Sequence, residues 1–302
     1  MTRGLCPVLS LLFLTGGFLY STGQDFKISD NVDYVLLDVS VRDADGAFVG
    51  DLHKSNFKIF EDKRPREITY FSGEDLPLAV GLVVDNSGSM ASKRPRVVMA
   101  GLAFAKESNP HDEFFVVNFN DSVTRGLPPS VPFTDSLQLL RHALYLGEPG
   151  GRTALYDAIS YALRHLEFSK LQRRTVIVVS DGKDNASKMS FSALEKDLQA
   201  SRATVFTIGL PNLETDDLNH RVLKKIAQMT GGQFFEPIDI SEIVPVFHEI
   251  SKDLRHRYTI EYAPDEMANK RVVRHVKVVV RDRGRKLHAR TRTTYSIAKA
   301  IR

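Results

Sequence analysis

The sequence is poor in the residue types that crosslink proteins or bind soft metal ions. Its 302 residues include one cysteine, Cys6, and no tryptophan. A single thiol cannot form an internal disulfide, and it cannot build a cysteine zinc cluster. A chain of this length can bury a core large enough to stay folded without crosslinks. Cysteine-based metal binding and structural disulfides are therefore excluded.

Motifs of several enzyme classes are also absent. The sequence has neither a Gly-x-x-x-x-Gly-Lys-Ser/Thr loop nor a Gly-x-Gly-x-x-Gly loop, so nucleotide binding has no support. It has no Gly-x-Ser-x-Gly elbow of a serine hydrolase. Its nine histidines are scattered without a His-x-x-x-His pair, which argues against a zinc site on a helix.

Charge gives little direct indication of a partner. The formal net charge is +4, which is too small to indicate nucleic-acid binding. Basic residues concentrate near the end, where 270–302 holds twelve Lys or Arg and one acid. They alternate with apolar residues, so we interpret them as the solvated faces of strands. The alternative is a surface for anionic polymers, lipid head groups or nucleic acid, but Tyr295 is the only Phe, Tyr or Trp there that could stack on a base.

The beginning of the chain has the pattern of a secretory signal peptide. Arg3 precedes a mostly apolar run over 5–19, and the small residues Ser21 and Gly23 follow it. We expect residues 1–23 to be removed and the protein to be exported to the periplasm or cell exterior. The run is shorter than the about 20 residues that a membrane span needs, so we expect no stable transmembrane segment. A retained anchor is the alternative.

Hydrophobic periodicity divides the remaining chain into three zones. Apolar and polar residues alternate in 24–75 and in 256–302, which predicts short antiparallel strands. Because neither zone can bury a core alone, we expect them to pack together as a small β-sandwich-like unit. The turns of this unit are predicted at 43–46, 61–65 and 282–284.

Residues 76–255 show a different pattern. Uninterrupted apolar runs at 78–84, 114–119, 175–179 and 204–209 are separated by segments with helical spacing. Such runs indicate strands that are buried on both faces. This zone is therefore predicted to be a doubly wound, Rossmann-like α/β domain, with a mainly parallel sheet of about six strands and helices on both faces.

Polar side chains gather where two of these strands are predicted to end. Asp85 and Asp181 directly follow buried runs. Ser87 and Ser89 lie two residues apart in the first loop, where we expect Gly88 to relax the backbone. A third hydroxyl, that of Thr153, follows the glycine-rich segment 149–152. Ligands of open α/β sheets bind at this end of the strands, so the five polar residues form a candidate site.

The chemistry of these side chains suits a hard divalent cation. Mg²⁺ prefers oxygen ligands in near-octahedral geometry and keeps several waters. The hydroxyls can bind it directly, while the two carboxylates hold bound waters and offset its charge. Mainly neutral ligands leave the ion a strong Lewis acid with an open position, which a carboxylate of another molecule can fill. We expect Mg²⁺, with Mn²⁺ or Ca²⁺ as alternatives.

The order Asp85-x-Ser87-x-Ser89, Thr153, Asp181-Gly182 resembles the metal-ion-dependent adhesion site (MIDAS) of von Willebrand factor type A (VWA) domains. The resemblance covers 76–255, and the five positions match without substitution. It implies that Ser87, Ser89 and Thr153 hold the metal, with Asp85 and Asp181 in support. It also implies adhesion or protein binding without catalysis. The three-zone layout more loosely resembles exported bacterial proteins that contain this domain.

Simpler interpretations of the same residues exist. Asp-x-Ser-x-Ser alone is a common turn or helix cap, and Thr153 is a candidate N-cap. Our leading hypothesis is an exported, non-enzymatic protein whose metal ion engages an acidic group of a protein or peptide partner. A second hypothesis is an architectural subunit of a cell-envelope assembly, in which the metal only stabilises the fold. A metal-dependent hydrolase is a weaker third hypothesis because no general base is evident.

Overall fold

The computed structural model describes residue 1 and residues 34–210, 218–264 and 273–296. The expected signal peptide at 1–23 lies outside the described residues, so its prediction stays open. Within the described ranges, no helix is long and apolar enough to cross a membrane.

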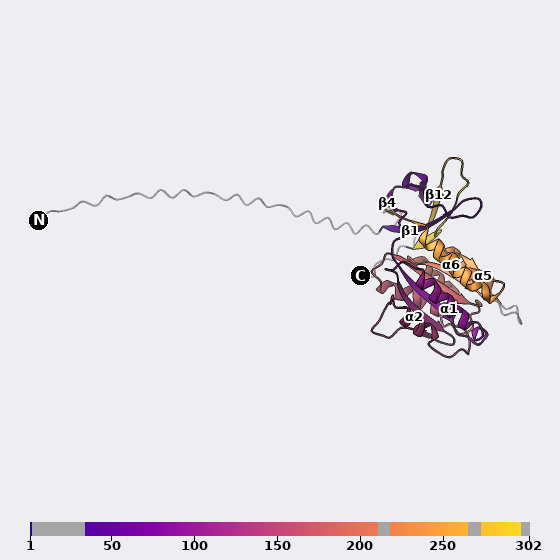
Figure 1. Ribbon diagram of the computed structural model, residues 1–302. Coiled ribbons are helices and arrows are strands. Elements are labelled where there is room, and N and C mark those ends of the chain that lie inside the picture. The colour runs from indigo at the N-terminus through magenta and orange to yellow at the C-terminus, as the bar shows by residue number, and fades with distance from the viewer. Residues whose placement is uncertain (2–33, 211–217, 265–272, 297–302) are drawn as a thin grey trace. The chain divides into compact units, whose positions relative to one another are not determined.

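A six-stranded sheet forms the centre of the α/β part (Figure 1). Its strands, in spatial order, are β10 (Phe234–Phe235), β9 (Thr204–Gly209), β8 (Arg173–Ser180), β5 (Leu78–Asp85), β6 (Glu113–Phe119) and β7 (Val123–Arg125). All neighbours pair in parallel except β6 and β7. Every residue of β5 is buried. Its uninterrupted apolar sequence follows from this, because helices cover both faces of a parallel sheet.

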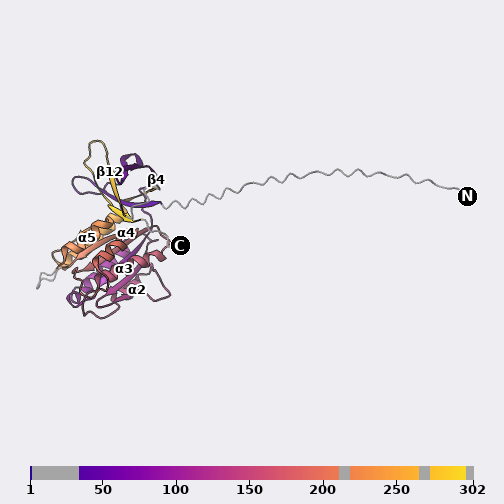
Figure 2. The same cartoon turned by 180° about the vertical axis from the view of Figure 1, so that it is seen from behind.

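Helices cover the sheet on both faces (Figures 1 and 2). One layer contains α1 (Arg94–Lys106), α2 (Leu137–Tyr145) and α6 (Ile243–Arg255), and the other contains α3 (Leu155–His165), α4 (Phe191–Ala200) and α5 (His220–Thr230). Three of the helices begin at polar N-caps, whose side chains accept a backbone N–H of the first turn. These caps are Ser136, Ser190 and Asn219. The predicted doubly wound α/β fold is confirmed.

The flanking zones build a separate β unit. The first zone provides β1 (Val35–Arg42), β2 (Phe57–Glu61), β3 (Arg64–Arg66) and β4 (Ile68–Ser72), and the last provides β11 (Arg257–Tyr262), β12 (Val273–Val280), β13 (His288–Arg290) and β14 (Thr294–Ser296). They form two four-stranded sheets in the orders β13-β1-β11-β4 and β14-β12-β2-β3. Leu37, Ile59, Tyr258 and Val276 contribute to their common hydrophobic core. The two zones thus combine into one β unit, as the sequence predicted.

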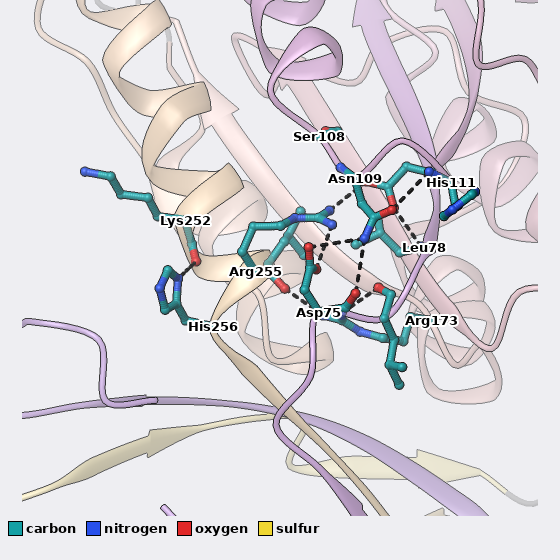
Figure 3. Close-up of polar contacts among 12 residues, drawn as sticks. Asp75, Leu78, Ser108, Asn109, His111, Arg173, Lys252, Arg255 and His256 are labelled. Atoms are coloured by element: carbon teal, nitrogen blue, oxygen red, sulfur yellow. Dashed lines mark hydrogen bonds and ion pairs between the residues drawn. The ribbon is translucent and has the colours of Figure 1, made fainter. Parts of the chain in front are cut away.

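Buried polar contacts fix the β unit on the α/β domain. Arg173 on β8 donates through Nε to Asp38 Oδ1 on β1 at 3.2 Å. Figure 3 shows a neighbouring cluster around the segment that enters β5. There Arg255 pairs with Asp75 at 2.8 Å and with Asp112 at 2.7 Å. Asp112 Oδ1 also accepts the backbone N–H of Leu78 at 2.9 Å, so the cluster fixes the start of the central strand.

The structure also corrects several local predictions. The sequence did not reveal α2, because apolar residues lie on its exposed side as well as on its buried side and obscure the period. The predicted turn at 61–65 is tighter than expected, since only Asp62 and Lys63 have positive φ and Arg64 already belongs to β3. The alternation at 287–293 predicts a single strand, but the structure has two in this region, because β13 pairs with β1 and β14 pairs with β12 in the other sheet.

The interpretation of the basic C-terminal zone is wrong for two arginines. Lys277 and Arg281 are exposed, as expected for solvated strand faces. Arg274, however, is fully buried and pairs with Glu61 at 2.6 Å. Arg292 is also buried, with 6% of its surface exposed. Arg274 shares the inward face of β12 with the buried Val276, and Arg292 lies between β13 and β14, outside both strands.

Candidate metal centre

The two predicted carboxylates meet at the carboxyl edge of the central sheet. β5 ends at Asp85, and Asp181 directly follows the end of the neighbouring parallel strand β8. Parallel strands present their carboxyl ends on the same side, which brings residues 96 positions apart together. Both side chains are almost fully buried, with 1% of their surface exposed. A cation between them would therefore be poorly screened by solvent.

The loop after β5 folds its hydroxyls toward Asp181. Asp85 Oδ1 accepts the backbone N–H of Ser87 at 2.8 Å, which turns the chain sharply after the strand. The Oγ atoms of Ser87 and Ser89 lie 3.2 Å apart. Ser89 Oγ donates to Asp181 Oδ2 at 2.7 Å. Four of the five predicted residues are thus joined by direct hydrogen bonds. Gly88 has no positive φ and has open space around its α-carbon, so the expected need for glycine is wrong.

Thr153 reaches the same edge of the sheet on the loop before α3. Its N–H donates to Asn185 Oδ1 at 2.8 Å, and its carbonyl accepts the N–H of Asn185 at 3.0 Å. The loop is linked to the first one, because Gly88 N–H donates to the carbonyl of Gly151 at 3.4 Å. Among the described residues, the Thr153 hydroxyl makes no hydrogen bond to the other four side chains. Ala154 occupies the N-cap position of α3, so Thr153 is not its cap.

Burial and charge act together on Asp85. Loss of solvent raises the pKa of this carboxyl to about 6, although hydrogen bonds from Ser180 and Ser87 oppose the shift. The nearby charge of Asp181 also contributes to this raised pKa. Ser180 Oγ donates to Asp85 Oδ2 at 2.6 Å. Two carboxylates in a dry site repel each other, and a divalent cation would relieve that repulsion.

Lys93, just before α1, adds a positive charge near the carboxylates. Its Nζ donates to the carbonyl of Leu210 at 3.0 Å. Burial lowers the pKa of Lys93, while the charges of Asp181 and Asp85 raise it. The ammonium thus compensates part of their negative charge, and it would repel a metal ion bound beside them.

Sequence reasoning missed four residues that position the site. Ser180 and Asn185 hold Asp85 and Thr153, and Lys93 contributes charge. Asn86 Nδ2 donates to the carbonyl of Leu146 at 3.3 Å and so holds the neighbouring loop. Ser180 and Asn185 flank Asp181 closely in sequence, and that proximity was the only available signal. No local pattern marks Lys93.

The donor set fits a hard cation. In the described part of the chain, no three His, Cys, Asp or Glu side chains gather as a metal-binding group. An ion at this edge would therefore depend on serine and threonine hydroxyls supported by two carboxylates. All of these donors are oxygen atoms, which Mg²⁺, Mn²⁺ and Ca²⁺ prefer over softer metals.

Comparison with known proteins agrees with this fold. The family model of the von Willebrand factor type A domain matches residues 80–183, a range that includes all five candidate residues. A solved von Willebrand factor type A protein from Catenulispora acidiphila superposes with a TM-score of 0.53 at 14% identity, covering 88% of this chain and 75% of that one. A D319A mutant of the PilB minor pilin from Streptococcus sanguinis gives 0.50 at 13% identity, covering 60% and 62%.

Two curated proteins match at low identity. Inter-alpha-trypsin inhibitor heavy chain H4 from Bos taurus is 22% identical over 65% of this chain. An uncharacterised protein of Borreliella burgdorferi is 23% identical over 50% of it. The matches span 23% and 46% of the lengths of these relatives. Family model and fold together identify this chain as one that contains a von Willebrand factor type A domain.

Proposed function

We propose that this chain is an exported, non-enzymatic binding protein whose VWA domain engages a partner through a divalent cation. The observation that carries the proposal is the convergence of Ser87, Ser89 and Asp181 beside Asp85 at the carboxyl edge of the sheet. Type A domains are generally interaction modules, which agrees with a binding role. The cation would be Mg²⁺, with Mn²⁺ or Ca²⁺ as alternatives, and the partner would present a carboxylate.

The five candidate residues would have different roles according to their chemistry. The hydroxyls of Ser87, Ser89 and Thr153 would hold the ion, and Asp85 and Asp181 would balance its charge. When bound, the ion would supply a Lewis-acidic position for an acidic side chain of a protein or peptide. Ser180 and Asn185 act as positioning residues, because they hold Asp85 and the backbone of Thr153.

The surroundings of the site support a protein partner. Tyr145 and Leu146 are exposed large side chains, with 48% and 43% of their surface accessible. The hydrogen bond from Asn86 to the carbonyl of Leu146 keeps them beside the candidate centre. Exposed aromatic and aliphatic side chains around a polar centre are a common arrangement at protein interfaces. In the described residues, no histidine hydrogen-bonds to Ser87 or Ser89, so these hydroxyls lack the serine–histidine pair of a nucleophilic hydrolase.

The test measures metal binding first and partner binding second. Isothermal titration with Mg²⁺ and Mn²⁺ should show one site, which Ser87→Ala and Asp181→Ala weaken at least tenfold. Ser130→Ala and Asp135→Ala are matched controls, since both residues are exposed and lie in a loop near the amino ends of the strands. Partners captured in Mg²⁺ should be released by chelator. The proposal fails if chelator and both site variants leave capture unchanged.

The same experiment tests the architectural alternative. Buried contacts such as Arg173–Asp38 tie the β unit to the domain, which suits a rigid building block. If the metal only stabilises the fold, chelator will lower the melting temperature but leave captured partners bound. In that case the partner would be bound by the β unit and not by the cation.

A further inference from the structure

Arg292, between β13 and β14, is a buried cation with no ion pair among the described residues. Only 6% of its surface is exposed. Its one hydrogen bond in the described part of the chain runs from Nη2 to the carbonyl of Ala203 at 3.3 Å. A guanidinium has five N–H donors, so most of its binding capacity is unused.

Three other buried arginines have a carboxylate partner, whereas the buried Arg94 donates to the backbone carbonyls of Leu144, Leu146 and Gly147. Arg257 pairs with Asp253 at 2.8 Å, Arg274 pairs with Glu61 at 2.6 Å, and Arg173 pairs with Asp38 at 3.2 Å. The carboxylate of Asp38 attracts Arg292 from a distance, but Asp38 forms its ion pair with Arg173. Burial, together with the charge of Arg202 and against the charge of Asp38, lowers the pKa of Arg292 to about 10. Burying a charge without a close counterion is unfavourable, so a bound anion at Arg292 would relieve that cost.

Arg292 lines a cavity of about 620 Å³ between the β unit and the α3–α4 layer. Three more arginines line the same cavity, namely Arg164 on α3, Arg174 on β8 and Arg202 after α4. Arg164 and Arg202 are exposed and have no ion pair among the described residues, whereas Arg174 pairs with Glu167. The lining carboxylates of Glu167 and Asp197 are already engaged, by Arg174 and by the hydroxyl of Ser160.

The remaining walls of this cavity are largely apolar. Leu36 on β1, Leu163 on α3 and Tyr295 on β14 are buried side chains that line it. A volume of about 620 Å³ falls in the range of small-molecule sites. An apolar wall beside three cations without ion pairs suits a ligand with an apolar body and an anionic end. Arginine binds carboxylate and phosphate through two parallel hydrogen bonds, so both acid groups fit.

We propose that this cavity is a second ligand site, which binds a small organic acid with an apolar chain and pairs its carboxylate or phosphate with Arg292. Arg202 and Arg164 stand at the opening and attract the anion. The site shares no residue with the candidate metal centre, and its occupation does not require a metal ion. Because β1, β14, α3 and α4 all contribute to the walls, a bound ligand would bridge the β unit and the α/β domain.

The test uses simple amphiphilic ions as probes of the full chain. Isothermal titration calorimetry with octanoate and with octyl phosphate should each show one site. Octylammonium, which has the same apolar chain and the opposite charge, should bind at least tenfold more weakly. Whichever of the two anions binds more tightly identifies the acid group. Chelator should leave these affinities unchanged, which separates this site from the metal centre.

Variants assign the binding to the arginines. Arg292→Met keeps the apolar stem of the side chain at similar length, and it should weaken the binding of octanoate at least tenfold. If that variant fails to fold, Arg164→Ala combined with Arg202→Ala changes only exposed residues and should weaken octanoate at least threefold. Arg141→Ala is the control, since Arg141 is an exposed arginine on α2 that does not line the cavity. Equal binding of octanoate and octylammonium, or wild-type affinity in both sets of variants, overturns the proposal.

Discussion

Lys93 is the residue whose charge would oppose a metal ion bound at the candidate centre. Its ammonium interacts with the two carboxylates of the candidate centre. We therefore expect Lys93→Met to tighten Mn²⁺ binding by about fourfold, because removing a like charge at short range lowers the electrostatic free energy of the bound ion. Titration calorimetry at low ionic strength measures this. Lys106→Met, which removes an exposed charge at the far end of α1, should change nothing. Weaker binding in Lys93→Met would mean that the lysine helps to build the site.

His165, at the end of α3, makes folding stability depend on pH. Its Nε2 donates to the carbonyl of Pro132 at 2.7 Å, and its ring packs against Phe115 with centroids 4.3 Å apart. Burial lowers the pKa of His165 below its ordinary value of 6.5. In the pH range just below 6.5 the unfolded chain therefore binds more protons than the folded chain.

It follows that the contribution of His165 to stability is present above pH 6.5 and is lost as the pH falls toward the lowered pKa. Urea unfolding across this range should show stability decreasing with acidification. His165→Gln should be less stable but should show a smaller decrease. If the unfolding free energy of wild type and of His165→Gln fell equally with pH, His165 would be ruled out as the source of the pH dependence.

At the scale of single elements, the loop before α3 depends on Gly151. This glycine has a φ of +79°, and a β-carbon on it would lie 1.9 Å from Asp121 Oδ2. Asp121 accepts from the N–H of Arg152 at 3.1 Å, so displacing it disturbs the loop that carries Thr153. We expect Gly151→Ala to cost about 1–2 kcal/mol of stability and to weaken Mg²⁺ binding several-fold.

A matched variant separates backbone strain from the site effect. Gly284 has a similar φ of +77°, but a β-carbon there would have no other atom within 4 Å. Gly284→Ala should therefore lose stability through strain alone and keep its Mg²⁺ affinity in calorimetry. Equal loss of Mg²⁺ affinity in both variants would mean that the effect of Gly151→Ala does not arise from the loop that carries Thr153.

The whole molecule is held together at a buried junction between the β unit and the α/β domain. Asp253 at the end of α6 accepts from Arg257 of β11 at 2.8 Å and also from Arg290 of β13. Asp253 and Arg257 are fully buried. We expect Asp253→Asn to lower the free energy of unfolding by about 3–5 kcal/mol, because it leaves buried guanidinium charge without its counterion.

Equilibrium urea unfolding followed by far-ultraviolet circular dichroism measures this loss. Because the junction is buried in both parts, wild type should unfold in one transition, and the variant should do so at lower urea. Asp45→Asn is the control, since Asp45 is exposed in a turn of the β unit. Two separate transitions in wild type would show that the β unit and the α/β domain are not one cooperative unit.

The amino-acid sequence by itself determined the fold class and the candidate site. Uninterrupted apolar runs indicate strands buried on both faces, because a strand that is covered on both sides carries apolar side chains at successive positions. The positions of Asp85 and Asp181 at the ends of two such runs were enough to predict that they meet. Alternating residues at both ends of the chain likewise predicted the β unit, although not that β13 and β14 join different sheets.

Only the tertiary structure decided which polar groups face each other across the chain. Lys93 approaches the carboxylates and Asn185 holds Thr153 because separate loops converge at one edge, and no local pattern encodes such distances. The same holds for Arg292, which in sequence looks like one more basic residue in an alternating strand. It is buried just before β14, which lies against α4, and a bound anion would offset the unfavourable burial of its charge.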